Sequence, residues 1–271
     1  MPLPRTLHQI APGSAVDVTT IDAADTSAAP GDKQVTIAAT EVLADRLAEL
    51  QEVLWARRDQ KVLVVLQGMD TSGKGGTVEH VFGAVNPAGL RVTSFKAPTE
   101  AELARDYLWR IHANVPADGE IGVFDRSHYE DVLVVRAEEL VPEARWSRRF
   151  SHINAFEQML VDEGTTVVKL LLHISKDEQK RRLQARLDDP AKHWKFRPGD
   201  LTTRARWDAY QTAISDAVTR TSTEHAPWHV IPADKKWYRN WVVASIMVEV
   251  LERLDLRWPD AAPGLDAITI D

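Results

Sequence analysis

The chain has 271 residues, 44% of them hydrophobic, with a formal net charge of −7 and a pI near 5.7. This length and hydrophobic content suit one α/β domain with a sizeable core, and the acidic balance argues against a general nucleic-acid-binding protein, so any anion site must be a local basic pocket. The lack of cysteine excludes disulfides and thiolate metal sites, and the lack of a signal pattern or of an apolar run of about 18 residues predicts a cytoplasmic protein with no membrane association.

The N-terminal segment differs in composition from the rest of the chain. Residues 1–34 are rich in Ala, Pro, Asp, Ser and Thr and poor in large apolar side chains, which predicts a mostly irregular arm. We expect a single domain over residues 35–260 and a C-terminal tail over residues 261–271. Residues 37–58 follow a helical pattern in which leucines share one stripe, more typical of core packing than of a dimer interface. These leucines are Leu43, Leu47, Leu50 and Leu54.

Further along, apolar segments alternate with helical ones. Strands are predicted at residues 62–67, 90–95, 121–124, 166–174 and 228–231. Helical patterns cover residues 100–114, 129–163, 176–188 and 204–221, and a last amphipathic helix lies near 237–254. Strands rich in Val, Ile and Leu that are separated by helices favour an α/β fold with a central parallel sheet covered on both faces. Ligands of such sheets bind beyond the carboxyl ends of the strands.

A glycine-rich segment follows the first of these strands. Gly68 and the pair Gly73-Lys74 have the spacing of a phosphate-binding loop, whose backbone N–H groups surround an anion at a helix N-terminus. Lys74 would supply a point charge to the outer phosphates. A plain glycine-rich turn is the alternative, but the strand before and the helix after favour the phosphate loop. The other predicted phosphate-binding or nucleotide-binding residues of the loop are Met69, Thr71, Ser72, Gly75, Gly76 and Thr77.

Two positions depart from the usual loop. Gly75 stands where a Ser or Thr would normally hold magnesium, and Asp70 lies inside the loop, where a bare carboxylate would repel phosphate. Both departures are explained if Asp70 takes part in holding Mg²⁺ and the metal screens it from the phosphates. Thr77 is a weaker candidate for replacing the missing hydroxyl.

A second acidic residue ends the strand at residues 121–124. An acid in this place, Asp125 here, reaches magnesium beside the phosphates in phosphate-loop enzymes. Arg126 is next and is a candidate to bind a phosphoryl oxygen, with a surface ion pair as the alternative. Since Lys96, Asp125 and the loop all follow strands, we expect them to meet at one edge of the sheet.

Residues 175–200 carry the third feature, which we interpret as a mobile helical lid. Ser175 and Glu178 form a capping box that opens a helix, on which Arg182 and Arg186 share a face. Residues 176–197 contain eight basic side chains but only four acidic ones. A solvated helical face is the alternative explanation for this local excess.

These motifs together resemble the polyphosphate kinase 2 family. The resemblance covers roughly residues 40–258 and is carried by segments 68–76, 95–99, 123–133, 174–182, 188–195, 221–228 and 231–238. It implies a P-loop kinase fold like that of thymidylate kinase, and magnesium-dependent transfer of phosphoryl groups between inorganic polyphosphate and nucleotides, with Mn²⁺ as a possible substitute metal. The short, single-domain members that phosphorylate AMP, ADP or both are the most similar, through residues 127–133.

The resemblance also implies roles for individual residues. Asp70 and Asp125 are the metal-linked acids, and Lys74 is the loop lysine. The remaining candidates are the catalytic residues Arg126 and Arg182 and the binding residues Lys96, Glu130, Asp131, Arg181 and Arg186. Adenine nucleotides are the expected partners, with guanine nucleotides as further candidates, and a homodimer or homotetramer is the expected assembly.

Two other functions are compatible with parts of the pattern. An ATP-dependent nucleoside monophosphate kinase would use the same loop and acids. A regulatory protein that binds nucleotide or polyphosphate without turnover is the second alternative, but it would not need Asp70, Lys74 and Asp125 together.

Overall fold

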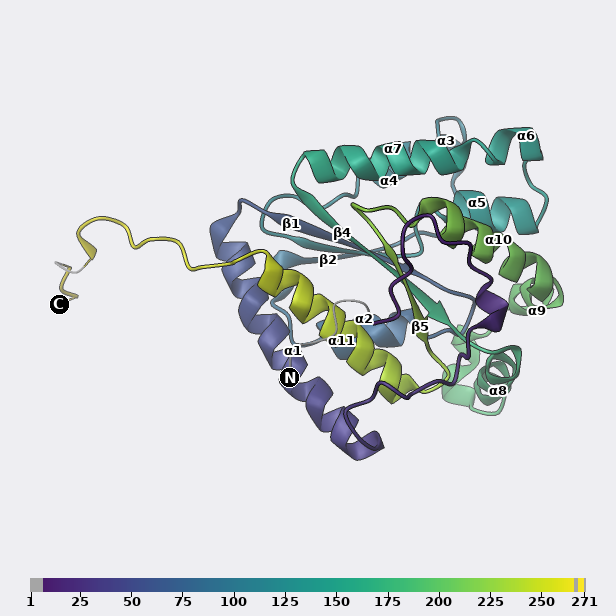
Figure 1. Ribbon diagram of the computed structural model, residues 1–271, viewed down its shortest axis with the longest axis horizontal. Helices are drawn as coiled ribbons and strands as arrows, with labels where there is room; N and C mark the ends of the chain where they lie inside the picture. Colours follow the sequence, from purple (N-terminus) through teal and green to yellow (C-terminus); the bar gives the residue numbers. More distant parts are fainter. Residues whose placement is uncertain (1–6, 266–267, 271) are drawn as a thin grey trace.

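The computed structural model describes residues 7–265 and 268–270 (Figure 1). Its core is a sheet of five parallel strands in the order β2-β3-β1-β4-β5. The strands are β1 (Lys61–Gln67), β2 (Leu90–Ser94), β3 (Ile121–Asp125), β4 (Thr165–His173) and β5 (Trp228–Pro232). The predicted α/β fold with a parallel sheet is therefore confirmed.

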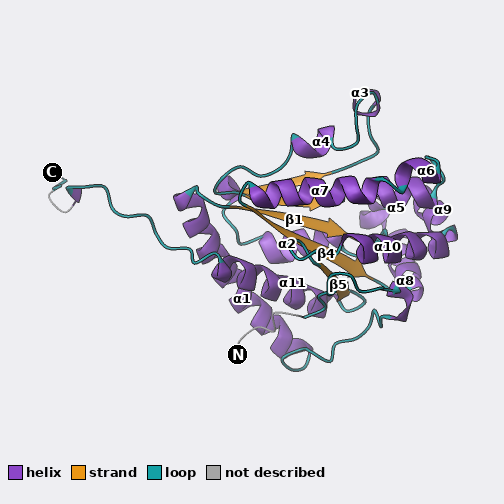
Figure 2. Cartoon of the chain, turned by 45° about the horizontal axis from the view of Figure 1, so that its top comes forward, coloured by secondary structure: helices purple, strands orange, loops and turns teal. Residues whose placement is uncertain are grey.

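Helices cover both faces of the sheet (Figures 1 and 2). One face carries α1 (Lys33–Arg57), α2 (Lys74–Phe82) and α11 (Lys236–Arg253), which pack on one another. The other carries α5 (Glu130–Ala137), α7 (Arg149–Asp162) and α10 (Trp207–Thr221). Beyond the carboxyl ends of the strands lie α8 (Lys176–Leu187), η3 (Pro190–Lys195) and α9 (Gly199–Ala205). Short helical turns complete the chain: η1 (Val18–Thr20), η2 (Pro87–Gly89), α3 (Glu100–Leu103), α4 (Trp109–His112) and α6 (Glu143–Trp146).

The apolar strand segments are buried because helices cover them from both sides. In β1, every residue from Val62 to Leu66 has 0% exposure. Burial of such aliphatic side chains contributes roughly 1.5–3 kcal/mol each, so this central strand is a major source of stability and a rigid support for the loop that follows it.

Two predicted helices are interrupted. The segment 100–114 forms α3 and α4 with a turn between them, where the Asp106 carboxylate accepts the N–H of Leu108 at 3.0 Å, a local bond that competes with helix formation. The segment 129–163 is divided into α5, α6 and α7. Glu139, with a left-handed φ of 56°, and Pro142 separate α5 from α6. Each of the two predicted helical segments therefore contains more than one helix.

The described part of the predicted N-terminal arm contains the short turn η1 and packs on the domain. Val18 is fully buried, and the edge strand β5 exchanges hydrogen bonds with the arm, from Ile10 N–H to Trp228 O and from Val230 N–H to His8 O, both 2.8 Å. The arm thus covers a sheet edge that would otherwise be unpaired. Residues 1–6 of the predicted arm and residues 266, 267 and 271 of the predicted tail lie outside the described residues.

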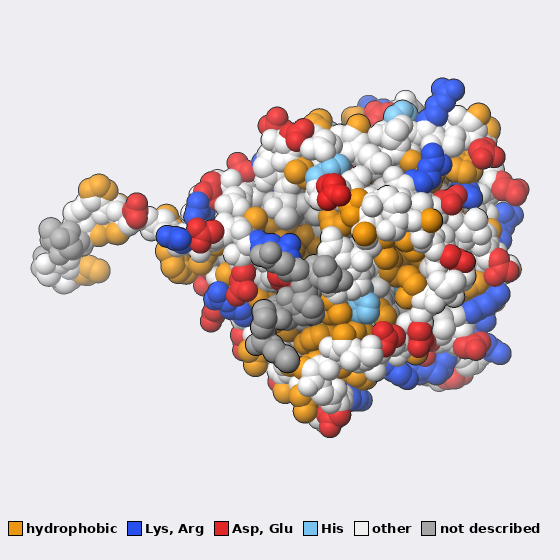
Figure 3. All heavy atoms as spheres, viewed as in Figure 1, with side chains coloured by type: hydrophobic (Ala, Val, Ile, Leu, Met, Phe, Trp, Pro, Cys, Tyr) orange, Lys and Arg blue, Asp and Glu red, His pale blue; other side chains and the backbone are white. Residues whose placement is uncertain are grey.

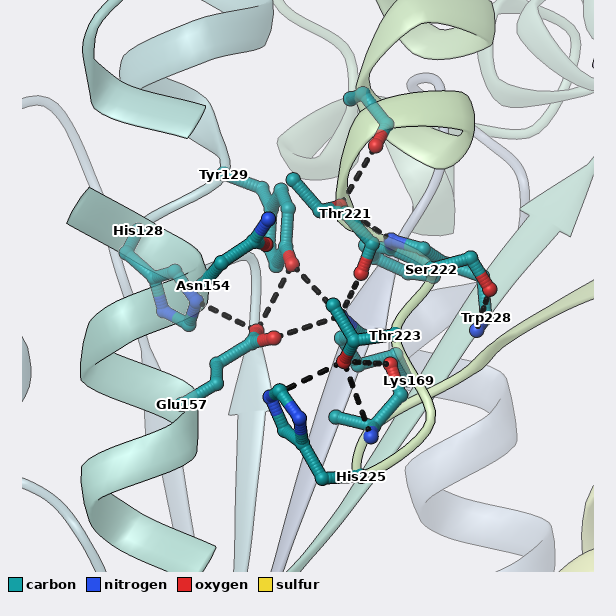
Figure 4. A network of polar contacts seen from close by, with 12 residues as sticks. His128, Tyr129, Asn154, Glu157, Lys169, Thr221, Ser222, Thr223, His225 and Trp228 are labelled. Carbon is teal, nitrogen blue, oxygen red and sulfur yellow. Dashed lines mark hydrogen bonds and ion pairs between the residues drawn. The ribbon is translucent and has the colours of Figure 1, made fainter. Parts of the chain in front are cut away.

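A buried charged network lies between the sheet and the helices α7 and α10 (Figure 4). Lys169 Nζ on β4 donates to Glu157 Oε2 and Thr221 O, both at 2.6 Å, and to the Tyr129 hydroxyl at 3.0 Å. Glu157 Oε1 in turn accepts from Tyr129 at 2.8 Å and contacts His128 Nε2 at 3.1 Å. The network therefore fixes the turn between β3 and α5, which directly follows Asp125 and Arg126.

We expect Lys169→Met to lower the free energy of unfolding by about 3–5 kcal/mol, because it leaves Glu157 as an unpaired buried charge. The double variant Lys169→Met, Glu157→Gln should recover part of this loss, since the buried charge is gone and the glutamine oxygen still accepts from Tyr129. Urea denaturation of the two single variants and the double variant measures the coupling. Simply additive losses would contradict the ion-pair account.

Candidate active site

The glycine-rich loop joins β1 to α2 at the carboxyl edge of the sheet. In the register of the two central strands Leu66 is paired with Asp125, so the loop begins beside the acid that ends β3. Gly73 caps α2 with a φ of 104°, a conformation that glycine adopts without the strain of a Cβ atom. The predicted loop and second acid are thus brought together.

The carbonyl oxygens of this loop are all turned to protein donors. Each of the six carbonyls from Gly68 to Gly73 accepts a hydrogen bond. The donors are Lys74 Nζ to Gly68 O (2.7 Å) and Met69 O (3.4 Å), Gln179 to Asp70 O (3.2 Å), Arg182 to Thr71 O (2.9 Å) and Ser72 O (3.0 Å), Arg239 to Ser72 O (3.3 Å), and the Thr77 N–H to Gly73 O (2.8 Å). With the carbonyl dipoles held in this way, the loop can present N–H groups to an anion without opposing carbonyl dipoles.

Arg182 lies behind the loop instead of projecting from an open lid surface. Its Nη2 also donates to Ala233 O at 2.6 Å and to Asp234 O at 3.1 Å, and its Nε pairs with Glu178 at 2.6 Å. The side chain is only 8% exposed. In this conformation Arg182 connects α8, the phosphate loop and the end of β5, which is a supporting role that its sequence pattern did not indicate.

Around Arg126, cations and acids of the site neutralise one another. Arg126 Nη2 pairs with Asp70 at 2.7 Å and its Nη1 contacts Glu130 at 3.5 Å. The carboxylate of Glu130, followed by those of Asp70 and Asp125, raises the pKa of Arg126, although burial opposes this. Burial raises the pKa of Glu130 and lowers that of Lys74. Five predicted residues therefore act on one another electrostatically at one place.

Several buried oxygens of the site have no hydrogen-bond partner among the described residues. They are Asp125 Oδ1, Thr71 Oγ1 and Ser72 Oγ. Free hard oxygen atoms beside a phosphate loop suit Mg²⁺ or Mn²⁺ and their bound water, so Asp125 and the neighbouring Asp70 fit a metal. No cluster of three or more acidic or histidine side chains in the described part of the chain could hold a metal alone, so other ligands would come from phosphate and water. Thr77 Oγ1 donates to Gly73 O at 3.1 Å, and its role as a metal ligand stays a prediction.

Two hollows meet at Arg126 and Glu130, which line both. The smaller, about 360 Å³, lies between the loop and the helices α9 and α10. The larger, about 1050 Å³, extends away from the loop over α3, α5 and α6 and is lined by Lys96 and Asp131. Its other basic lining residues are Arg105, Arg110, Arg145, Arg148 and Arg149. A site of this size and charge suits an anionic molecule as large as a nucleotide.

Some basic side chains of the predicted lid already form hydrogen bonds or ion pairs within the protein. Arg181 is exposed and pairs with Glu178, while Arg186 donates to Lys195 O at 2.8 Å and pairs with Asp200 at 3.2 Å. Figure 3 shows Lys and Arg side chains along the right-hand and lower right edge, where α8 and α9 lie in Figure 1. Closure of this segment stays a prediction.

Sequence reasoning missed Gln179 and Arg239, which donate to loop carbonyls from α8 and α11. Gln179 lies three residues before Arg182, on the same helical face. Arg239 and Asn240 are polar residues within a helix whose other central positions are apolar, from Trp241 to Met247 except Ser245. A charged side chain in such an apolar helix is the one sequence signal that could have identified Arg239.

The chain is similar to known proteins over most of its length. The family model for polyphosphate kinase 2 matches residues 31–258. The AMP/ADP-polyphosphate phosphotransferase of Meiothermus ruber is 55% identical over 264 residues, which cover 97% of this chain and 99% of that protein. The ADP-polyphosphate phosphotransferase of Rhodopseudomonas palustris is 41% identical over 232 residues, or 81% and 80% of the two chains.

The fold is likewise similar to a solved structure. The crystal structure of polyphosphate kinase 2 from Arthrobacter aurescens superposes with a TM-score of 0.93 at 48% identity, covering 96% of this chain and 93% of that one. Among the described residues no helix is both long and apolar enough to span a membrane.

We expect Arg182→Gln to reduce the free energy of unfolding by about 2–4 kcal/mol, because its guanidinium holds buried carbonyls of two separate segments. The matched control is Arg181→Gln, which removes the same charge from the next residue of α8. That exposed side chain should cost less than about 1 kcal/mol. Thermal and urea denaturation of both variants measure the difference, and equal, small losses would show that Arg182 does not support the loop.

Proposed function

The chain belongs to the polyphosphate kinase 2 family, and from this premise we propose that it is an enzyme that transfers phosphoryl groups from inorganic polyphosphate to AMP and ADP with Mg²⁺. The observation that carries the proposal is the phosphate loop whose carbonyls are all engaged, with Asp70, Asp125 and Arg126 beside it. The names of the similar proteins from Meiothermus ruber and Rhodopseudomonas palustris support AMP and ADP as the acceptors.

In the proposed reaction, the loop N–H groups and Lys74 hold the terminal phosphates of the polyphosphate chain. The nucleotide lies in the larger hollow, with its phosphate directed toward Arg126 at the junction of the two hollows. A terminal oxygen of AMP or ADP attacks the last phosphorus of the chain, the bridging P–O bond breaks, and the shortened polyphosphate leaves with the electron pair. The reaction is reversible in principle.

This chemistry needs alignment and charge neutralisation more than covalent help from the protein. Mg²⁺, held by Asp70 and Asp125, would neutralise the charge that develops on the phosphoryl oxygens. For Asp70 to serve, Arg126 must exchange that carboxylate for a phosphate oxygen, which its planar guanidinium binds well. Exclusion of water by the 175–200 segment would favour transfer to the nucleotide over hydrolysis.

We further propose that the protein is cytoplasmic and that it assembles as a homodimer or homotetramer. Light scattering of the purified protein would test the assembly.

The direct test offers AMP and ADP separately to the protein, with Mg²⁺ and long-chain polyphosphate and without ATP. We expect ADP and ATP to form, and GMP and GDP in parallel reactions to measure base preference. If ATP phosphorylates AMP while polyphosphate of every length is inert, the protein is instead an ATP-dependent nucleoside monophosphate kinase. If the protein uses no phosphoryl donor, the result would favour a regulatory protein that binds nucleotide or polyphosphate without turnover.

Lys74→Met should reduce this activity by on the order of a hundredfold or more, because charge stabilisation of the transferred group is lost. The matched control is Lys33→Met, an exposed lysine in the first turn of α1, which should leave activity unchanged. Near-wild-type turnover by a folded Lys74 variant would contradict the assignment of the loop.

Asp70→Asn and Asp125→Asn should each raise the Mg²⁺ concentration needed for half-maximal activity and lower the maximal rate. Because both carboxylates are assigned to one metal site, the double variant should be much less impaired than the product of the single effects predicts. Magnesium titrations of the three variants test this. An unchanged magnesium requirement in the Asp70 variant would assign its carboxylate another role.

A further inference from the structure

Arg239 is a buried arginine in the N-terminal half of α11 and, unlike Arg126, lines neither of the two hollows beside the loop. It has 2% exposure. Its Nη1 donates to Ser72 O at 3.3 Å, and its Nε and Nη2 donate to the side-chain oxygen of its neighbour Asn240 at 3.1 and 2.7 Å. These acceptors are all neutral, so the guanidinium is hydrogen-bonded without being compensated in charge.

No carboxylate in residues 7–265 or 268–270 lies within ion-pair distance of Arg239. Its neighbour Arg182 differs, since Glu178 pairs with it at 2.6 Å. Burial, followed by the charge of Arg182, lowers the pKa of Arg239 to about 10, so it is still charged at neutral pH. A buried charge without a counter-ion is normally strongly destabilising, which makes its presence at this place informative.

The position of Arg239 is fixed closely against the phosphate loop. A Cβ atom added to Gly73 would lie 1.8 Å from Arg239 Nη1, and one added to Gly76 would lie 3.5 Å from Nη2. The φ of 104° at position 73 favours glycine, and a Cβ atom there would also force the end of the Arg239 side chain to move. Because C=O and N–H point in opposite directions across a trans peptide, holding Ser72 O directs the N–H of Gly73 away from Arg239.

We propose that Arg239 is a positioning residue for phosphate, a fixed positive charge beneath the loop whose counter-charge is the phosphate chain bound on the loop's other side. The proposal rests on the proposed function in taking that anion to be polyphosphate. Arg239 acts through the peptide of Ser72 and Gly73 and through its field, with no direct contact to the phosphate. Its charge favours the liganded state in particular, because only that state contains the compensating anion.

The ligand-free and phosphate-bound states differ in whether the charge of Arg239 is compensated, and this difference affects stability. In the ligand-free protein Arg239 is an uncompensated cation, so a carboxylate placed beside it should stabilise the fold. The same carboxylate would compete with phosphate for the field of Arg239 and weaken phosphate binding. Asn240→Asp is the substitution that does this, because it is isosteric and its oxygen already accepts two hydrogen bonds from Arg239.

The test measures binding of tripolyphosphate by isothermal titration calorimetry, with Mg²⁺ present and nucleotide absent, together with the melting temperature of the ligand-free protein. We expect Asn240→Asp to raise the melting temperature and to weaken tripolyphosphate binding about tenfold or more, the scale of one charge interaction in a partly dehydrated site. Arg239→Gln should weaken binding by a similar factor, and Arg239→Lys, which keeps the charge, by less.

Arg253→Gln is the matched control, since it removes an arginine from the far end of the same helix, where the side chain is 46% exposed, and it should bind as the wild type does. If Asn240→Asp and folded Arg239→Gln both bind tripolyphosphate normally while Lys74→Met does not, the proposal for Arg239 is overturned and the proposed function stands. Wild-type protein that does not bind tripolyphosphate would contradict both.

Discussion

The arrangement of this protein depends on one electrostatic constraint, which is that a loop built to hold phosphate must keep its carbonyl oxygens away from it. Backbone N–H groups attract an anion only where neighbouring carbonyl dipoles are turned elsewhere. Here the carbonyls from Gly68 to Gly73 are all paired, mainly with donors from the first turn of α2, from α8 and from α11. The packing of these two helices therefore belongs to the site as much as the glycine-rich sequence does.

The same constraint explains how charge is distributed around the loop. Arg182 and Arg239 lie behind it, buried, and provide donors and positive potential without being exposed to solvent. Near the start of the loop, Arg126 is shared between Asp70 and Glu130, so these three charges compensate one another when no ligand is bound. Binding of magnesium and polyphosphate would then replace these internal pairs by pairs with the ligand, at lower cost than creating new charges in a dehydrated site.

Much of the fold and the front of the site follow from local sequence patterns. The apolar strands, the loop spacing of Gly68 and Lys74, and the acid that ends β3 each carry their signal within a few residues. The back of the site does not. Arg182 was expected on a lid, but its guanidinium reaches loop carbonyls more than a hundred residues away in sequence, and Arg239 contributes through a helix near the end of the chain. Such contacts follow from how helices pack on the sheet, which residue spacing alone does not determine.

A crystal structure of the protein with AMP, Mg²⁺ and a polyphosphate analogue would test the proposed mechanism most directly. Methylene groups in place of the bridging oxygens of the analogue would block transfer. We expect the terminal phosphate on the N–H groups of the loop and on Lys74, the metal on Asp70 and Asp125, and Arg126 released from Asp70 and bound to a phosphoryl oxygen. Phosphate bound elsewhere, with the Arg126–Asp70 pair intact, would contradict the account.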